Sequence, residues 1–351
     1  PDKRAPKTKD TLFIFYDLET RQEKMLGDGS FLHEPNLCVF AQCCDECIET
    51  NIKICYKCGV TQQVLRVNPV NNFTDGLTFN IVVIAHNGQA FDHQFCLKYV
   101  LTKTDLKPEL IMRGIKIISM TIANVRFLDS LNYFPMGLSK LPKVFDLGPE
   151  LKKGYFPHLF NTLENEKYVG PLPYVEYYDA DNMKIKDREK FLQWYGQHKY
   201  DVFDMQRDLV ECCVSDVQIL KEACLKFRQQ LLETTNVCPF TEACTIASAC
   251  NKVFRRNFLE PNTIGIIPKD GYRWRENQSK IAIQWLVWEE KQRSVNIIHA
   301  AKQQEAVVNG AKVDGYCSET KQVFEFSFFT GATTASNITE LNPLTGALRK
   351  L

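Results

Sequence analysis

The sequence predicts an α/β protein built around a mixed sheet. Two short apolar runs rich in β-forming residues, 11–16 and 79–85, are typical of buried strands. Strands come first along the chain, then strands alternate with helices, and helices follow, which is the order expected of an α/β fold. The fold class alone does not decide the function, which depends on the side chains that the elements bring together.

The first half of the chain contains most of the expected strands. The strand at 11–16 is followed by a polar, Cys-rich stretch to about residue 75, and the strand at 79–85 leads into a helix at 91–103. Apolar and polar residues then alternate over 109–134, which predicts a hairpin of strands. The loop-rich stretch that follows is marked by five prolines: Pro142, Pro149, Pro157, Pro171 and Pro173.

The second half is mainly helical. Helices are predicted at 187–198, 200–235, 241–259 and 279–293, and a hairpin near 312–326. Pro261–Gly271 has the composition of a linker, and the residues from Ser327 onward show the weak periodicity typical of disorder. We therefore expect a linker or disordered segment at 1–10, a domain at 11–236 with a Cys-rich insertion at 36–62, an incomplete helical part at 237–326, and an irregular tail at 327–351.

Composition excludes some classes of protein and leaves others open. Hydrophobic residues make up 44% of the chain, including 23 Phe, which is enough for a sizeable core. No apolar run approaches the roughly 20 residues of a membrane span, and the charged N-terminus lacks the apolar region of a signal peptide. Fourteen Cys without such a signal indicate a reducing, intracellular compartment, nuclear or cytoplasmic. The net charge of +1 neither indicates nor excludes a nucleic-acid partner.

A pair of carboxylates follows the first predicted strand. Asp17 and Glu19 lie two residues apart, so they point to the same face, while Leu18 points to the other. Two carboxylates on one face repel each other unless a cation lies between them. A lone Asp-x-Glu is nevertheless more often an ordinary strand end with solvated acids.

Two further acidic positions complete the pattern. Asp92 follows Asn87 and Phe91 directly after the second apolar strand, although an acid at this position could simply stabilise a helix N-terminus. Asp216 lies in the apolar stripe of the helix at 200–235, where a carboxylate is costly unless it is paired or binds a metal. Val217 could take the place in the stripe instead, which would leave Asp216 at its edge.

The joint pattern of acids is stronger than any one motif. Four carboxylates that converge can hold two Mg²⁺ or Mn²⁺ ions about 3.5–4 Å apart, an arrangement that hydrolyses phosphodiesters. One ion generates hydroxide from water and the other stabilises the leaving 3′ oxygen. The sequence therefore predicts a two-metal nuclease site formed by Asp17, Glu19, Asp92 and Asp216.

A cluster of cysteines predicts a second, different metal site. Cys44 and Cys47 form one C-x-x-C pair, and Cys55 and Cys58 form another, with Gly59 after it to support a turn. Four thiolates prefer tetrahedral Zn²⁺, and a closed site of this kind is structural. Cys38 and Cys43 could substitute as ligands, and a Cys-rich loop without metal is the alternative. We expect this insertion to lie near the entrance of the nuclease site and apart from the carboxylates.

The order of these motifs resembles the DEDD exonuclease domain of family B DNA polymerases. Asp17 with Glu19, Asn87 with Phe91-Asp92, and Asp216 match its three motifs, and the similarity extends over about residues 11–326. The resemblance implies a ribonuclease-H-like fold with a helical C-terminal part, two Mg²⁺ or Mn²⁺ ions, and removal of nucleotides from a primer 3′ end.

Further motifs are similar to the protein-primed branch of that family. Ser130-Leu131-Asn132-Tyr133-Phe134 resembles a motif that contacts single-stranded DNA and the terminal, or priming, protein, and Lys143 lies where that branch has a lysine of its exonuclease site. Stretches at 138–161, 215–220 and 245–259 resemble polymerases of Maverick- or Polinton-type transposons. The residues that the resemblance assigns to single-stranded DNA are Asn87, Phe91, Ser130, Leu131 and Phe134, although core packing is the commoner role of a single aromatic residue.

Two departures from the family pattern affect the expected activity. The third motif has Tyr one helical turn before its Asp, where this chain has Cys212, a shorter and weaker hydrogen-bond donor. The polymerase motifs are absent, and the resemblance stops at Ser327, as after a truncation, an alternative exon or a frameshift. We expect a weakened exonuclease and no nucleotide incorporation by this chain alone; the alternative is a catalytically degenerate module that binds DNA or a terminal protein.

Overall fold

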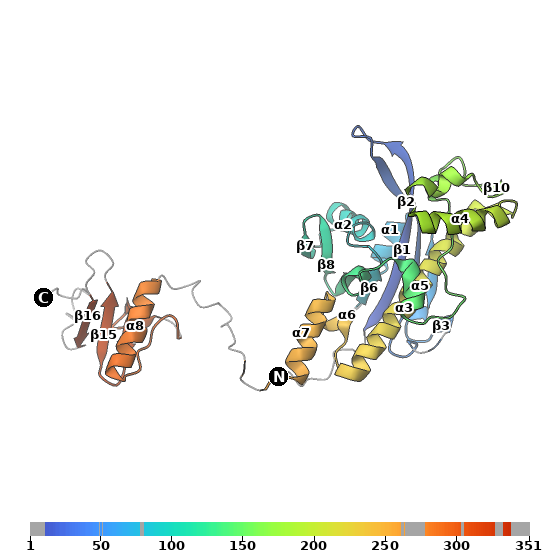
Figure 1. Cartoon of the computed structure of the whole chain (residues 1–351). Coiled ribbons are helices and arrows are strands. Elements are labelled where there is room, and N and C mark those ends of the chain that lie inside the picture. The colour runs from blue at the N-terminus through green and yellow to red at the C-terminus, as the bar shows by residue number, and fades with distance from the viewer. Residues whose placement is uncertain are drawn as a thin grey trace. The chain divides into compact units, whose positions relative to one another are not determined.

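The computed structural model describes residues 11–48, 50, 52–77, 81–260, 263, 278–302 and 305–326, and the backbone of 333–337. Figure 1 shows the elements of the two compact units into which the chain divides, Pro1–Pro261 and Asn262–Leu351. The expected linker at 1–10 lies outside the described residues, as does most of the linker expected at Pro261–Gly271.

A seven-stranded mixed sheet with the order β5-β2-β1-β6-β9-β8-β7 forms the centre of the first unit. Its strands are β1 Leu12–Met25, β2 Phe31–Cys43, β5 Gln62–Leu65, β6 Ile81–Ala85, β7 Glu109–Arg113, β8 Lys116–Ile122 and β9 Val125–Asp129. β1, β6 and β9 run parallel, and every other neighbouring pair is antiparallel. The predicted strands at 11–16 and 79–85 and the predicted hairpin are therefore confirmed in their described parts.

β1 is longer than predicted because its polar second half pairs with β2. Arg21 lies opposite Glu34 and Met25 opposite Phe31, so the two strands form a hairpin arm that extends beyond the rest of the sheet (Figure 1). Hydrogen bonding between the strands, rather than apolar packing, supports this part. A periodicity argument based on buried residues cannot detect such a strand.

Helices cover both faces of the sheet. The long helix α5 Met205–Thr235 packs on the face formed by residues such as Phe13 and Phe15. The opposite face, which includes Ile14 and Tyr16, packs against α1 Pro69–Asp75 and α2 Asp92–Lys103. The alternation of neighbouring residues between the two cores follows directly from the pleat of β1.

The Cys-rich insertion is shorter than expected. Residues 36–43 belong to β2, in which Leu37–Cys43 pair with β1 and Cys38–Ala41 also pair with β5, so the insertion begins at Cys44. It contains the small hairpin of β3 Ile54–Cys55 and β4 Gly59–Val60. β5 then rejoins the sheet at its edge.

The remaining elements of the first unit are short or peripheral. They are α3 Leu141–Val144, α4 Ile185–His198, α6 Pro239–Glu242, α7 Ile246–Asn257, β10 Val169–Gly170, β11 Phe203–Asp204, and the 3₁₀ helices η1 Ser130–Asn132, η2 Leu138–Lys140, η3 His158–Phe160, η4 Val175–Tyr178 and η5 Ala180–Asn182. The helix predicted at 241–259 is two helices, because Thr245 caps α7 in a capping box with Ser248.

The domain boundary expected after residue 236 is not observed. Phe240 of α6 is fully buried in the core that contains α5, and the Tyr133 hydroxyl donates a hydrogen bond to the Ala243 carbonyl at 3.0 Å. These contacts join α6 to the first unit, which extends to Pro261.

The second unit consists of a helix and small sheets. Its elements are α8 Lys280–Arg293, β12 Ala306–Val308, β13 Ala311–Val313, β14 Gly315–Cys317, β15 Gln322–Phe326 and β16 Thr333–Asn337. β16 pairs with β15, so part of the tail expected to be irregular is a strand, while the rest lies outside the described residues. Among the described residues of the whole chain, no helix combines the length and apolar character needed to cross a membrane.

Candidate functional site

The four predicted carboxylates line one cavity of about 230 Å³. Asp17 and Glu19 come from β1, Asp92 begins α2 directly after the loop that follows β6, and Asp216 lies in the middle of α5. The other lining residues are Leu18, Thr20, Gln22, His86, Asn87, Phe91, Lys153 and His158. The structure therefore brings together acids that are separated by up to about 200 positions in the sequence.

Strand direction explains why these acids meet. β1 and β6 pair in parallel from Leu12 to Phe15 and from Ile81 to Ile84, so the residues that follow the paired part of each strand lie on the same side of the sheet. The backbone N–H of Leu18 donates to Asp92 Oδ1 at 3.0 Å, which ties the second acidic motif to the first. Asp17 lies on the α5 face, where the Cys213 thiol is 3.6 Å from its Oδ2.

The electrostatics of the cavity favour a bound cation. Burial raises the pKa of the Asp17 carboxyl well above its ordinary value, and the carboxylates of Asp92 and Glu19 raise it further. Burial also raises the pKa of Asp92, to about 7. Asp216 Oδ1 is buried without a hydrogen-bond partner among the described residues. A cation in this cavity would relieve the repulsion and satisfy the oxygen, so the donor set fits hard divalent ions.

The lysine beside these acids is Lys153, and not Lys143. Lys153 Nζ donates a short hydrogen bond to Asp216 Oδ2. Burial lowers the pKa of the Lys153 ammonium, but the Asp216 carboxylate outweighs this and raises it overall. Lys143 is exposed on α3 and does not line the cavity. Sequence reasoning missed Lys153 because nothing local distinguishes it from the neighbouring lysines.

Cys212 and His158 lie beside the carboxylates as well. Cys212 precedes Asp216 by one turn of α5, and burial, followed by the Asp216 charge, raises the pKa of its thiol. It is therefore a neutral, weak donor at neutral pH. His158, which sequence reasoning did not identify, lines the cavity and places Nδ1 3.4 Å from Glu19 Oε2.

Asp129, at the end of β9, organises the loops around the cavity. Its Oδ1 accepts hydrogen bonds from the backbone N–H groups of Asn87 at 3.0 Å and Leu131 at 2.8 Å, and its Oδ2 accepts one from Gln89 at 2.9 Å. Asp129 is fully buried, and Asn87 adopts a left-handed conformation with φ 67°. One carboxylate thus holds two loops that were each predicted to contact DNA.

Of the residues predicted to hold single-stranded DNA, three line cavities and two are buried. Asn87 and Phe91 line the cavity, and Leu131 lines a neighbouring groove of about 1010 Å³ that shares His86, Asn87 and Lys153 with it. Ser130 is buried, with Oγ 2.8 Å from His86 Nδ1.

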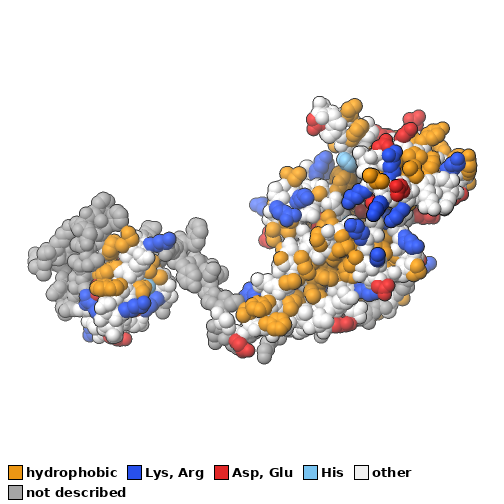
Figure 2. All heavy atoms as spheres, in the orientation of Figure 1, with side chains coloured by type: hydrophobic (Ala, Val, Ile, Leu, Met, Phe, Trp, Pro, Cys, Tyr) orange, Lys and Arg blue, Asp and Glu red, His pale blue; other side chains and the backbone are white. Residues whose placement is uncertain are grey.

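Phe134 is a core residue and not part of the groove. It is 5% exposed and packs edge-on against Phe145 and Phe227, so its ring cannot stack on a base without unfolding this region. Figure 2 shows a group of Lys and Arg side chains on one face of the first unit, beside a hydrophobic band. The net charge of +1 therefore conceals a local excess of positive charge.

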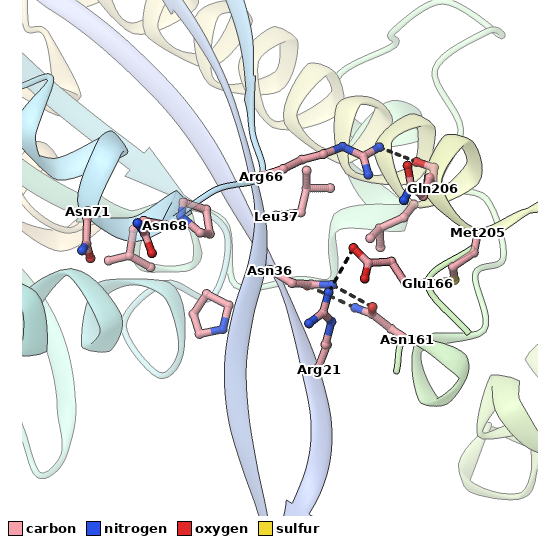
Figure 3. A pocket seen from close by; sticks show the side chains of 14 residues that line it. Arg21, Asn36, Leu37, Arg66, Asn68, Asn71, Asn161, Glu166, Met205 and Gln206 are labelled. Carbon is pink, nitrogen blue, oxygen red and sulfur yellow. Dashed lines mark hydrogen bonds and ion pairs between the residues drawn. The ribbon is translucent and has the colours of Figure 1, made fainter. Parts of the chain in front are cut away.

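A second cavity, of about 340 Å³, lies beside β1 and β2 at Arg21 and Asn36 (Figure 3). Asn36 and Asn161 exchange amide hydrogen bonds of 2.8 and 3.3 Å, and Asn161 Nδ2 also donates to the Thr20 carbonyl at 3.0 Å. Arg21 lies 3.4 Å from Glu166. These bonds hold β1 in place directly after Glu19, so the cavity wall supports the carboxylate site.

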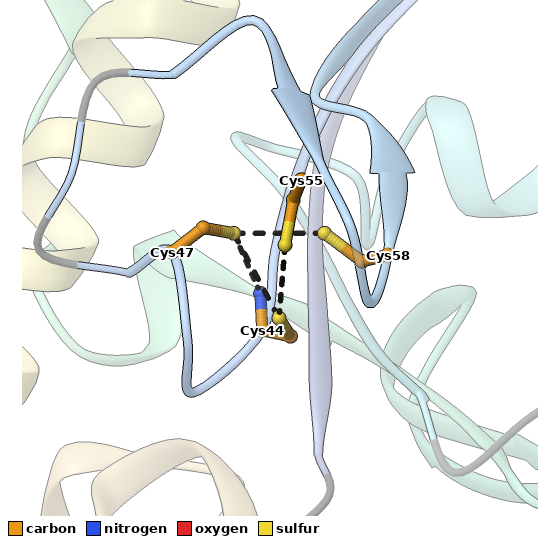
Figure 4. A group of neighbouring side chains, drawn as sticks. All are labelled: Cys44, Cys47, Cys55 and Cys58. Atoms are coloured by element: carbon orange, nitrogen blue, oxygen red, sulfur yellow. Dashed lines mark hydrogen bonds between the residues drawn. The ribbon is translucent and has the colours of Figure 1, made fainter.

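The four cysteines of the two C-x-x-C pairs form a compact cluster (Figure 4). All four sulfur atoms lie within 4.8 Å of one another. Three of the four side chains are buried. The cluster is compatible with a zinc ion.

Comparison with known proteins places the chain among DNA polymerases. Residues 79–292 match the family of organellar and viral type B DNA polymerases. This match includes Asp92 and Asp216 and covers more than half of the sequence. The chain belongs to this family. Asp17, Glu19 and the cysteine cluster lie before the matched residues.

Two fungal proteins and two solved structures are similar to parts of this chain. A probable DNA polymerase of Neurospora intermedia is 27% identical over 195 residues, which are 52% of this chain and 20% of that protein. One of Podospora anserina is 28% identical over 143 residues, 41% of this chain and 11% of that protein. The chain thus spans a fifth or less of these relatives.

The solved structures are of Phi29 DNA polymerase. Its complex with primer-template DNA and incoming nucleotides is 13% identical, with a TM-score of 0.41, and the match covers 82% of this chain and 38% of that one. Its complex with single-stranded DNA is 14% identical, with a TM-score of 0.39, and the match covers 70% and 34%.

Proposed function

We propose that this chain carries the 3′–5′ exonuclease of a protein-primed family B DNA polymerase and hydrolyses single-stranded DNA from its 3′ end. The observation that carries the proposal is the convergence of Asp17, Glu19, Asp92 and Asp216 on one cavity, with a buried oxygen of Asp216 left without a partner among the described residues. Within the part of the sheet ordered β5-β2-β1-β6-β9, β2 runs antiparallel to the other four strands, which supports a ribonuclease-H-like DEDD fold.

The four carboxylates would hold two Mg²⁺ or Mn²⁺ ions, because hard cations prefer carboxylate oxygens. Bound there, the ions would supply an activated water and stabilise the leaving oxygen. Lys153 holds Asp216 in place and adds positive charge where a phosphate would enter. Asp129 fixes the backbone of Asn87 and Leu131, which line the path of the single strand. The priming protein is proposed as a second partner, in contact with the partly exposed Leu131 and Asn132 of η1.

The experiment is degradation of a 5′-labelled single-stranded oligonucleotide with Mg²⁺ or with EDTA. We expect metal-dependent shortening from the 3′ end that is lost in Asp17→Ala. Asp105→Asn serves as the matched control, because Asp105 is exposed and does not line the cavity. Shortening that persists in Asp17→Ala, or in EDTA, would contradict the assignment of these carboxylates.

A second candidate function is a DNA- or terminal-protein-binding module without nuclease activity. Cys212 favours it, because a neutral thiol holds a water less firmly than the Tyr of the family pattern. Binding of the oligonucleotide without shortening, in the presence of Mg²⁺, would establish this alternative. The chain alone is not expected to incorporate nucleotides, since it lacks the polymerase motifs; primer extension by the purified chain would contradict this.

A further inference from the structure

The spacing of four sulfur atoms in the insertion matches a tetrahedral metal site. The Sγ–Sγ distances are 3.8 Å for Cys44–Cys47, 3.8 Å for Cys44–Cys55 and 3.5 Å for Cys47–Cys58 (Figure 4). A tetrahedron with Zn–S bonds of about 2.3 Å has edges of about 3.8 Å. A disulfide would require about 2.0 Å, so the spacing fits sulfur atoms arranged around an ion rather than bonded to each other.

We propose that Cys44, Cys47, Cys55 and Cys58 bind one Zn²⁺ ion in a closed, structural site. The ligands come from two turns: one follows β2, and the other is the β3–β4 hairpin. In the first, the Cys44 N–H donates to Cys47 Sγ at 3.3 Å, a bond that stabilises a thiolate. In the second, Gly59 has φ +81°, which lets the chain turn away after the last ligand. Four protein ligands leave no open position for substrate.

The two alternative ligands that the spacing allowed are not part of the cluster. Cys38 is buried in the core on the α1–α2 face of the sheet, and Cys43 pairs with Phe13 within the sheet. Neither belongs to the group of four sulfur atoms. The ligand set is therefore the two C-x-x-C pairs.

The insertion needs such an ion because it buries little apolar surface of its own. Its large apolar side chains are largely exposed: Ile54 71%, Tyr56 85% and Val60 47%. Segments too small to build a hydrophobic core are commonly held by a structural metal. The Gln42 side-chain amide also anchors the hairpin to the sheet, because it donates to the carbonyls of Cys58 and Val60 at 2.5 and 2.9 Å.

The site is separate from the carboxylates, so this inference does not depend on the proposed nuclease activity. In the β1–β2 register Asp17 lies opposite Val39 and Phe13 opposite Cys43. Four residues of strand span about 13 Å, and the cysteines begin one residue further on. The insertion thus begins next to the start of β1, near Phe13, and lies apart from the carboxylates. Loss of zinc should therefore lower the stability of the fold, and it should reduce hydrolysis only where the fold is lost.

The test uses the full chain purified without added metal, followed by elemental analysis. We expect about one zinc per chain, greatly reduced in Cys58→Ser and retained in Cys250→Ser and Asp17→Ala. Cys250 is exposed on α7 and lies outside the cluster, so it controls for loss of a thiol. Wild-type protein stripped with a chelator should melt at a lower temperature, and Co²⁺ added to it should give the visible absorption of a tetrahedral thiolate complex.

The measurements on wild-type protein keep the proposal testable if Cys58→Ser does not fold. Wild-type protein that contains no zinc, takes up no Co²⁺ and melts at the same temperature after chelation would overturn it. So would iron in place of zinc, or a disulfide within the cluster under reducing conditions.

Discussion

Replacing Lys153 with Met tests the electrostatic description of the carboxylate cavity. Lys153 is the cation bonded to Asp216, in a cavity that also contains Asp17, Glu19 and Asp92. Met keeps much of the length and apolar stem of lysine but removes the charge. The same substitution at Lys143, which is exposed on α3, provides a matched control.

The expected loss of stability follows from the burial of the pair. Removing one partner of a fully buried ion pair costs about 3–5 kcal/mol. The Lys153 side chain is 34% exposed and that of Asp216 is 6% exposed, so screening reduces the estimate to about 1–2 kcal/mol. In a unit of this size that lowers the melting temperature by roughly 2–8 °C. Mg²⁺ should restore part of the loss, because it supplies positive charge to the same oxygens.

The expected loss of activity is larger. Removing one preorganised positive group from a reacting centre commonly costs about 10²–10³ in rate. Lys153→Met should therefore slow 3′-end degradation by about that factor, measured as single-turnover cleavage at saturating Mg²⁺, while Lys143→Met stays near wild type. A slow Lys143→Met variant beside an unaffected Lys153→Met variant would refute this reading of the cavity.

Three further predictions concern residues around the same site. Cys212→Tyr should raise the exonuclease rate by about 10-fold, because a phenol holds a water more firmly than a neutral thiol; equal single-turnover rates would contradict this. Asp129→Asn should lower the unfolding free energy by about 1–3 kcal/mol, since an amide cannot accept all three backbone N–H bonds; denaturant titration checks this. His93 is fully buried, and burial lowers its pKa to about 4. The neutral imidazole therefore contributes to the free energy of unfolding above pH 6.5, and this contribution is lost as the pH falls towards 4. His93→Gln should reduce that acid sensitivity by about 3 kcal/mol, measured by urea titrations across this pH range; an unchanged pH dependence would contradict this.

The parts of the fold that were predicted correctly are those with a local signal. The buried strand before Asp17 and the helix that carries Asp216 show apolar periodicity, and Asp17 and Glu19 share a face because strands alternate. The two C-x-x-C pairs are also local. What the sequence did not reveal depends on partners far along the chain.

The missed features each depend on tertiary structure. β2 contains Pro35 and polar residues and becomes a strand by pairing with β1. The family resemblance assigns Phe134 to single-stranded DNA, yet its contacts with Phe145 and Phe227 place it in the core, which is the commoner role of a single aromatic residue. Lys153 acquires its position only when its loop meets α5. No window of local sequence contains that information, because loop closure brings together residues 63 positions apart.

The arrangement of β1 explains how one small domain could carry two kinds of metal site without exchange between them. The start of β1 near Phe13 lies beside the thiolates that follow β2, and the middle of the strand carries the carboxylates Asp17 and Glu19. Hard ions prefer the carboxylate oxygens and soft ions prefer the sulfurs. The two ligand sets are rigidly separated by a buried strand, so a chelator selective for zinc should remove one ion and leave Mg²⁺-dependent hydrolysis intact for as long as the sheet remains folded. If zinc removal instead abolished hydrolysis at once, at a temperature well below melting, the two sites would be coupled. That result would show that the insertion also positions the carboxylates.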